Sequence, residues 1–226
     1  MLAHGFLKGK LEQQLIQDIH SECLSYINKN SEIKNYYQDI SSEIPSIKNL
    51  LNKKLIQKAS ELIKGKIELK ATELHVQLPK CSAIPPHQDN FYHCLSFNES
   101  LKFLIPLQKL SKESGGLIYA NCNYDENIYD HLPSSISGFS SYIAEDKYFA
   151  RSFSETSYEY KLGDCSYHFG NSIHRSIGNQ TNQISMFIVF RIESNEAKQN
   201  IKSLNKYNKC YEEHIKLLRN KKERQN

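Results

Sequence analysis

The sequence has no apolar run that approaches the about 20 residues of a membrane-spanning helix. Residues 1–10 also lack the apolar core and small-residue cleavage site of a secretory signal peptide. We therefore expect no membrane association and a cytoplasmic location. No dense Lys/Arg stripe accompanies the net charge of +4, so we expect no nucleic-acid partner, although this charge is compatible with an acidic small molecule.

The chain also lacks any CxxC pair, because its six cysteines are scattered along it. This absence excludes a disulfide framework and a standard zinc finger, and it predicts free thiols. A structural zinc site built from two cysteines and two histidines is a disfavoured alternative, since zinc-finger cysteines lie about two to four residues apart. Its members would be Cys81, His87, His93 and Cys94. The six cysteines are Cys23, Cys81, Cys94, Cys122, Cys165 and Cys210.

Apolar residues recur at helical spacing near both ends of the chain. Two long helices are predicted between residues 9 and 64, the second beginning at Ser42 or Pro45. A third helix, at 195–222, packs on the rest of the chain or on a second copy, so a homodimer through this helix is one expectation. The apolar stripes are Leu11, Leu15, Ile16, Ile19, Cys23 and Ile27, then Ile47, Leu50, Leu51, Leu55, Ala59 and Ile63, then Ile201, Leu204, Tyr207, Cys210, Tyr211, Ile215 and Leu218.

Between these helical parts the pattern changes to short strands separated by Gly, Pro, Asn and Ser clusters. Many short strands with turn signals predict an antiparallel sandwich or barrel, so the fold class is mainly β with flanking helices. We predict one domain over residues 1–226: a helical buttress (1–65), a barrel (66–192) and the C-terminal helix. The polar stretch 121–138 is typical of a functional loop. The strand-like runs are 66–78, 91–97, 101–107, 116–120, 139–144, 157–160, 165–169 and 184–192.

His87 and Asp89 are the first candidate metal ligands. Residues two apart in an extended chain project from the same face, so an imidazole and a carboxylate lie side by side. This spacing alone occurs often by chance. His174 follows a Gly-Asp turn signal and a short strand, and would complete a site of two histidines and one carboxylate with open coordination positions, as in non-haem iron(II) oxygenases. His168 is a competing ligand, although a hydrogen-bonded strand histidine is the favoured interpretation.

Several segments in order resemble the phytanoyl-CoA dioxygenase-like family of iron(II)/2-oxoglutarate-dependent oxygenases, over roughly residues 74–191. The segments are the HxD motif at 87–89, the apolar strand at 101–107, the turn ESGGL at 113–117, Gly163-Asp164, and His174 with Ser176 and Asn179 beyond it. The resemblance implies a double-stranded β-helix (a jelly-roll, cupin-like barrel). It also implies iron(II), O2 and 2-oxoglutarate as cofactor and co-substrates, and hydroxylation of a small-molecule substrate with release of succinate and CO2.

The sequence departs from this family where an arginine usually anchors the far carboxylate of 2-oxoglutarate, about ten residues after the second histidine. Gln183 stands at that place and brings no charge, whereas a carboxylate in a dry pocket favours a charged partner. Lys102 lies on the strand from which Jumonji-type hydroxylases supply a lysine, and is the substitute we predict. Arg191 is too far along its strand from Gln183, and Arg175 should point away from His174.

The remaining candidate residues follow from the resemblance and from proximity to the HxD motif. Ser176 and Gln77 match positions that contact the co-substrate in the family. The residues that follow the motif are candidates for the substrate wall, namely Asn90, Tyr92 and His93. Two alternatives on the same barrel stay open: a Jumonji-like protein or peptide hydroxylase, and a cupin-type metal-binding protein that does not use 2-oxoglutarate.

Overall fold

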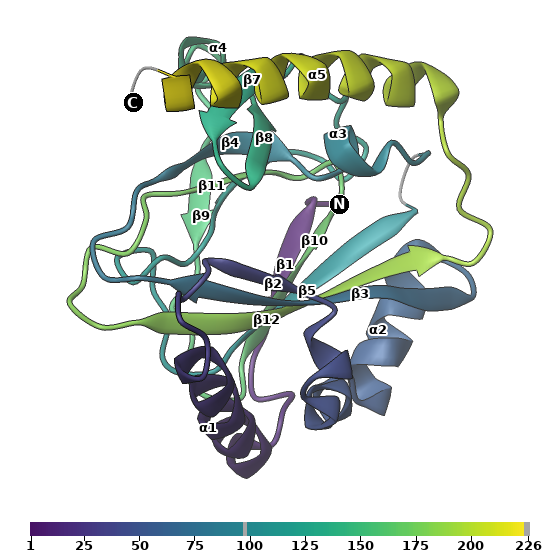
Figure 1. The fold of residues 1–226 in the computed structure, drawn as a ribbon. Helices are drawn as coiled ribbons and strands as arrows, with labels where there is room; N and C mark the ends of the chain where they lie inside the picture. Colours follow the sequence, from purple (N-terminus) through teal and green to yellow (C-terminus); the bar gives the residue numbers. More distant parts are fainter. Residues whose placement is uncertain (97–98, 224–226) are drawn as a thin grey trace.

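Two antiparallel sheets form the body of the protein in the computed structural model, which describes residues 1–96 and 99–223 (Figure 1). The larger sheet has the strand order β1-β10-β5-β12-β3-β2, and the smaller has the order β4-β11-β6-β9. A separate hairpin is formed by β7 and β8. The larger sheet comprises β1 (His4–Leu7), β10 (Cys165–Phe169), β5 (Ser100–Pro106), β12 (Ser185–Ser194), β3 (Ile67–Gln77) and β2 (Tyr36–Gln38). The remaining strands are β4 (Ile84–Gln88), β11 (Ile173–Ser176), β6 (Ile118–Ala120), β9 (Glu155–Ser157), β7 (Leu132–Ile136) and β8 (Phe139–Tyr142).

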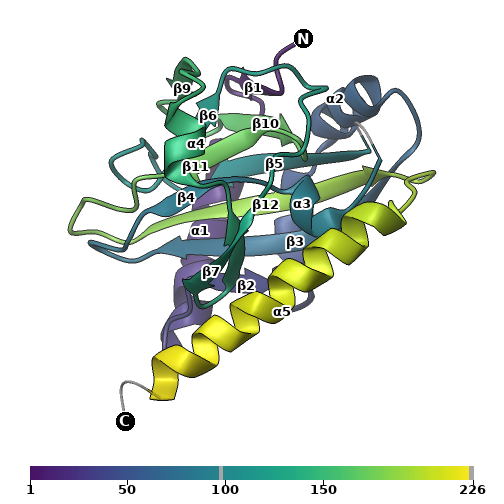
Figure 2. The same cartoon turned by 90° about the horizontal axis from the view of Figure 1, so that it is seen from above.

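Helices cover the outer face of the larger sheet and one end of the barrel (Figure 1). The helices between residues 13 and 63 pack on the outer face of the larger sheet. The C-terminal helix packs on the β7–β8 hairpin and α3. Figure 2 shows this last helix crossing the molecule diagonally. The helices are α1 (Gln13–Asn28), η1 (Ile40–Ser42), η2 (Pro45–Leu50), α2 (Lys53–Ile63), α3 (Asn90–His93), α4 (Glu145–Phe149) and α5 (Ile201–Glu223). No helix of the described residues is long and apolar enough to cross a membrane.

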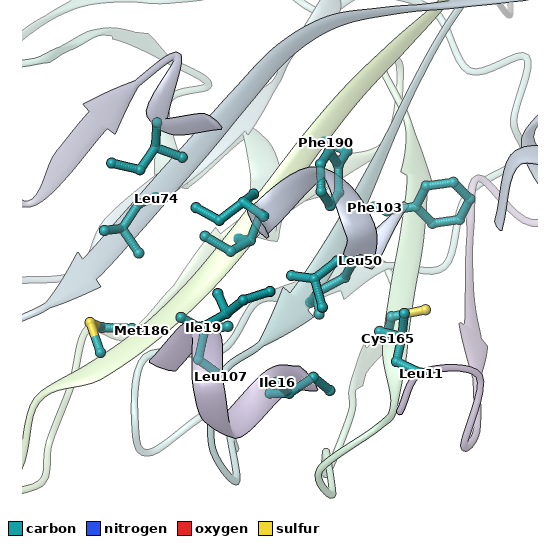
Figure 3. Close-up of a cluster of buried hydrophobic side chains, with 14 of the residues drawn as sticks. Leu11, Ile16, Ile19, Leu50, Leu74, Phe103, Leu107, Cys165, Met186 and Phe190 are labelled. Atoms are coloured by element: carbon teal, nitrogen blue, oxygen red, sulfur yellow. The ribbon is translucent and has the colours of Figure 1, made fainter. Parts of the chain in front are cut away.

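Alternation along β12 shows how the larger sheet separates two environments. Ile188 and Phe190 belong to the main core together with residues of α1, η2 and α2, and Figure 3 shows Phe190 in this core. Phe187 and Val189 point the other way, into the barrel. Because side chains alternate along a strand, Arg191 also faces the barrel interior. The predicted fold, a double-stranded β-helix with a C-terminal helix, is confirmed by this arrangement of sheets.

The prediction that residues 1–65 are helical is wrong in two places. β1 pairs with β10 and β2 pairs with β3, so both lie in the larger sheet. These strands have four and three residues, too few for an alternating pattern to be visible. The second long helix is also divided, because the chain leaves η2 at Leu51 and α2 begins again after Asn52.

Four strand assignments also differ from the sequence prediction. Residues 91–93 belong to α3 instead of a strand, and residue 97 of that predicted run lies outside the described residues. β4 was not predicted because Pro85 and Pro86 break a strand pattern, yet prolines are tolerated at a sheet edge, where β4 lies. β7 falls within the stretch predicted as a loop, and β11 follows β10 after a three-residue turn.

Asn52 joins the two halves of the N-terminal region. Its Oδ1 accepts a hydrogen bond from the backbone N–H of Leu55 at 3.0 Å, and its Nδ2 donates to the carbonyl of Lys10 at 2.9 Å. We expect Asn52→Ala to lower the free energy of unfolding by about 1 kcal/mol, because the cap is lost. Asn52→Asp, which keeps the cap acceptor, should lose less. Urea denaturation followed by circular dichroism measures both, and equal stability of all three proteins would contradict the capping role.

Candidate metal centre

The three predicted ligands meet inside the barrel. His87 lies in β4, Asp89 follows this strand, and His174 lies in β11. β4 and β11 pair so that His174 is the direct cross-strand partner of His87, and their ring centroids are 4.2 Å apart. One ligand atom from each of the three side chains lies within 4.8 Å of the other two. All three side chains are buried.

The two histidines present the same nitrogen to the site. Nδ1 of His87 is 3.0 Å from the carbonyl of Pro85, and Nδ1 of His174 is 3.1 Å from the carbonyl of Ser172. Each Nδ1–H therefore donates to the backbone, which leaves the Nε2 lone pair free to bind a metal. Burial lowers the pKa of His87 to about 4 and that of His174 well below its usual value, so both rings are neutral at pH 7.

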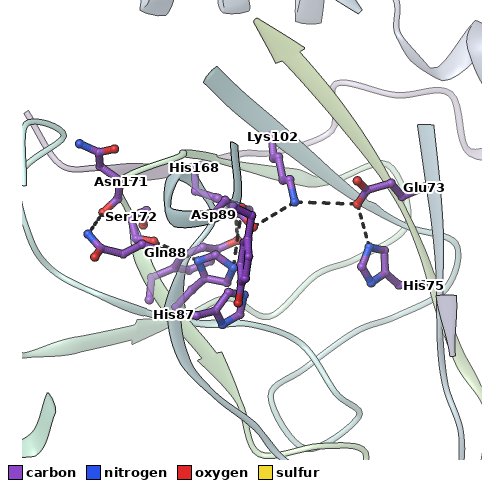
Figure 4. A network of polar contacts seen from close by, with 12 residues as sticks. Glu73, His75, His87, Gln88, Asp89, Lys102, His168, Asn171 and Ser172 are labelled. Carbon is purple, nitrogen blue, oxygen red and sulfur yellow. Dashed lines mark hydrogen bonds and ion pairs between the residues drawn. The ribbon is translucent and has the colours of Figure 1, made fainter. Parts of the chain in front are cut away.

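Asp89 is held by two side chains from the larger sheet (Figure 4). Lys102 Nζ donates to its Oδ1 at 3.1 Å, and Nε2 of His168 lies 3.0 Å from its Oδ2. Burial alone opposes the negative charge, but Lys102, His174 and His168 together hold the pKa of Asp89 well below its usual value. The carboxylate is therefore ionised and fixed in orientation before any metal binds.

Lys102 is itself part of a chain of charges. Its ammonium lies 3.9 Å from Glu73 Oε2, and the same oxygen is 3.1 Å from Nε2 of His75 (Figure 4). Burial favours neutral Lys102, but Asp89 and Glu73 outweigh it and raise the lysine pKa. Burial likewise acts against Glu73, yet Lys102 and His75 lower its pKa to about 2. Lys102 thus stays charged inside the barrel between two carboxylates.

His168 contacts a candidate ligand and is not itself a member of the candidate triad. Its Nε2 contacts Asp89, and its Nδ1 lies 3.3 Å from the hydroxyl of the buried Tyr119. This agrees with the interpretation of His168 as a hydrogen-bonded strand residue. A carboxylate oriented by such a partner is typical of metal sites, where the supporting residue fixes ligand geometry. The exact pairing was not predictable, because it depends on the register of β10 and β5, which sets His168 opposite Lys102.

The predicted co-substrate residues do not all gather at the triad. Ser176 is buried and its hydroxyl donates to the carbonyl of Gly115 at 3.3 Å. Gln77 lies beside the same glycine, because a Cβ at Gly115 would meet Gln77 Cγ at 2.8 Å. Gln183 is exposed in the loop before β12, so the structure does not bring its side chain to the site. Strand parity placed it inward, but β12 begins only at Ser185.

The predicted substrate-wall residues have three different environments. Asn90 is structural, since its side chain donates to the carbonyl of Leu95 and to Asn171. The Tyr92 hydroxyl donates to the carbonyl of Ser141 in β8. His93 has a buried Nδ1 without a hydrogen-bond partner among the described residues.

Arg191 and Arg175 differ in how well they were predicted. Arg175 faces outward and pairs with Glu155 at 2.7 Å, as predicted. The sequence predicted that Arg191 lies too far from Gln183 along its strand to reach the site. In the structure the candidate metal residues lie near the Arg191 end of this strand. The Cα of Arg191 pairs with Lys102 across the sheet, so Arg191 lies beside the charge network. The error came from taking Gln183 as the reference point for the site.

The donor set fits a divalent metal of the iron(II) type. Two neutral imidazoles and one carboxylate converge from one side, which leaves further coordination positions open. Among the described residues, His87, Asp89 and His174 are the only group of three such side chains that could hold a metal ion. The free Nε2 atoms and the two contacts that fix Asp89 support this fit.

Comparisons with known proteins support the fold. No family profile and no curated protein matches the sequence. Solved structures do match, at low identity. They include the epimerase SnoN in complex with Fe3+, alpha ketoglutarate and nogalamycin RO (14% identity, TM-score 0.73, 88% of this chain and 82% of that one). EvdO2 from Micromonospora carbonacea var. aurantiaca has 12% identity and a TM-score of 0.75 over 88% and 89% of the two chains. EctD from S. alaskensis, solved with 2-oxoglutarate and 5-hydroxyectoine, has 13% identity and a TM-score of 0.67 over 85% and 72%. The chain shares the fold of these proteins.

His168 provides a direct test of the supporting contacts. We expect His168→Leu to weaken iron(II) binding by about 10- to 100-fold, because Asp89 loses one of its two orienting partners. Tyr119→Phe removes the hydroxyl that contacts Nδ1 of His168 and Oγ of Ser166 but leaves His168 on Asp89, so it should weaken binding less. Calorimetric titration under nitrogen measures the affinity, with circular dichroism as the check of folding. Unchanged affinity in folded His168→Leu would show that the contact does not orient Asp89.

Proposed function

We propose that this protein is an iron(II)/2-oxoglutarate-dependent dioxygenase that hydroxylates a small molecule with release of succinate and CO2. The observation that carries the proposal is the cluster of His87, Asp89 and His174 inside the barrel, with both Nε2 atoms free. Structures with the same fold contain Fe3+ with alpha ketoglutarate, or 2-oxoglutarate. The ordered motifs that resemble the phytanoyl-CoA dioxygenase-like family add independent support.

The chain's own residues would hold and orient the reactants. His87, Asp89 and His174 would bind iron(II), and bound iron supplies oxygen activation coupled to the oxidative decarboxylation of the 2-oxo acid. Lys102 and His168 keep Asp89 ionised and oriented. The buried surroundings of the three ligands exclude water, which strengthens the electrostatic interactions at the site.

Lys102 is our proposed partner for the far carboxylate of 2-oxoglutarate. Its ammonium has three N–H donors, of which one is bonded to Asp89 and a second faces Glu73, so one is left for a ligand. Ser176 and Gln77, which both lie beside Gly115, remain further proposed contacts of the co-substrate. Gln183 no longer fits this role, because its side chain is exposed.

A Jumonji-like protein or peptide hydroxylase is the second candidate. A lysine at the position of Lys102 favours it, and Ser185 supplies no charge at the inward position that begins β12. The small-molecule assignment is preferred because α3, α5 and the β7–β8 hairpin contact one another over the metal end of the barrel. A peptide chain would need an open groove there.

Asp89 gives the test of the activity. Purified protein with iron(II), O2 and 2-oxoglutarate should release succinate slowly even without substrate, and Asp89→Ala should abolish this release because the metal loses its anionic ligand. Asp18→Ala, an exposed carboxylate of α1, is the matched control. Chromatography of succinate measures the rates. Wild-type rates in Asp89→Ala would exclude the triad, and no release from wild-type protein with bound iron would favour the cupin-type alternative.

Lys102 gives the test of the co-substrate site. Lys102→Met should raise the KM for 2-oxoglutarate by about 10- to 100-fold, because the co-substrate loses one charge-assisted hydrogen bond. Gln183→Ala should leave it unchanged. The measurement is made at saturating iron(II), with the iron affinity determined separately because Lys102 also supports Asp89. A larger effect of Gln183→Ala would place the anchor in the loop before β12.

A further inference from the structure

Arg191 and Glu193 form an ion pair that the proposed chemistry does not use. Both lie near the end of β12, where alternation directs them into the barrel. Arg191 Nε is 3.5 Å from Glu193 Oε1, too far for a hydrogen bond. Among the described residues Arg191 Nε is buried and has no hydrogen-bond partner. Burial with so few partners is costly unless a ligand supplies them.

The pair lies next to the metal residues and reaches solvent. Arg191 is the cross-strand neighbour of Lys102, whose ammonium contacts Asp89. On its other side Arg191 pairs with Ala71, which has a small side chain. The Arg191 side chain is 26% exposed, whereas that of Glu193 is 9% exposed. The guanidinium is thus open to solvent at one side, and the nearly buried Glu193 carboxylate lies beside it.

His93 adds a second unpaired polar atom on the α3 side of this space. Its Nδ1 is buried and has no partner among the described residues. The charges of Lys102, Asp89 and Arg191 all act on its ring. His93 therefore lies within the same group of charged side chains.

The balance of charge limits what kind of ligand fits. Two cations, Lys102 and Arg191, face the carboxylates of Asp89, Glu73 and Glu193. Iron(II) and the 2-oxoglutarate dianion would cancel each other, so one excess negative charge remains. A second anion would be repelled. A ligand with a carboxylate for Arg191 and a cationic group for Glu193 adds no net charge and supplies a partner to each.

We propose that Arg191 and Glu193, with His93 opposite, bind a zwitterionic, amino-acid-like primary substrate beside the metal. Arg191 receives the carboxylate in a bidentate manner, and Glu193 receives the ammonium group. This inference rests on the proposed function and names the substrate class for it.

The test uses wild-type protein loaded with iron(II) and 2-oxoglutarate under nitrogen. The twenty protein amino acids are screened by thermal shift, each beside its amide, which lacks the carboxylate, and its N-acetyl derivative, which lacks the cation. At least one free amino acid should raise the melting temperature, and calorimetry should show its two derivatives binding at least about tenfold more weakly. A panel without any binding amino acid, or derivatives that bind equally well, would overturn the substrate class.

Variants then assign the residues. Arg191→Gln and Glu193→Gln should each weaken the binding of the amino acid by about 10- to 100-fold and leave the Kd of 2-oxoglutarate unchanged. Arg219→Gln, an exposed arginine of α5, is the control. Arg191→Lys keeps the charge and serves if Arg191→Gln fails to fold. Unchanged amino-acid binding in the folded variants would overturn the assignment, and so would a loss of 2-oxoglutarate binding in Arg191→Gln. Wild-type protein that binds neither iron(II) nor 2-oxoglutarate would instead overturn the proposed function.

Discussion

The buried carboxylate of Asp89 is the constraint on which the site depends. An isolated charge inside a protein is costly, so it must be paired and hydrogen-bonded. Here Lys102 and His168 supply the partners, and each comes from a strand of the larger sheet. Lys102 in turn requires Glu73, so the charges extend from β10 and β5 across β12 to β3.

The two sheets of the barrel therefore supply different side chains to the site. The edge of the smaller sheet carries the histidines of the triad, whose orientation is fixed by backbone carbonyls close in sequence. The larger sheet carries the side chains that keep Asp89 ionised. Neither sheet makes the site alone, so its geometry depends on the packing of the barrel. This explains why supporting residues lie 13 and 79 positions from Asp89 in the sequence.

The parts of the site that follow from local spacing could be predicted from the sequence. His87 and Asp89 share a face because they are two apart, and ordered motifs identified His174. What depended on register could not be predicted. The contact of His168 with Asp89 and the position of Arg191 beside Lys102 follow from strand pairing, which the sequence does not reveal. Gln183 was misplaced because the start of β12 lies two residues later. In the fold, β1, β2 and β4 were missed because they are short or contain proline.

The proposed metal site should also bind a 2-oxo acid, and one spectroscopic measurement tests this directly. Chelation of iron(II) by 2-oxoglutarate produces a weak visible charge-transfer band under nitrogen. This band should appear when iron(II) and 2-oxoglutarate are both added to the wild-type protein, and it should be absent from His174→Ala. A wild-type protein that binds iron(II) but shows no band with saturating 2-oxoglutarate would contradict the proposed binding of the 2-oxo acid at the metal.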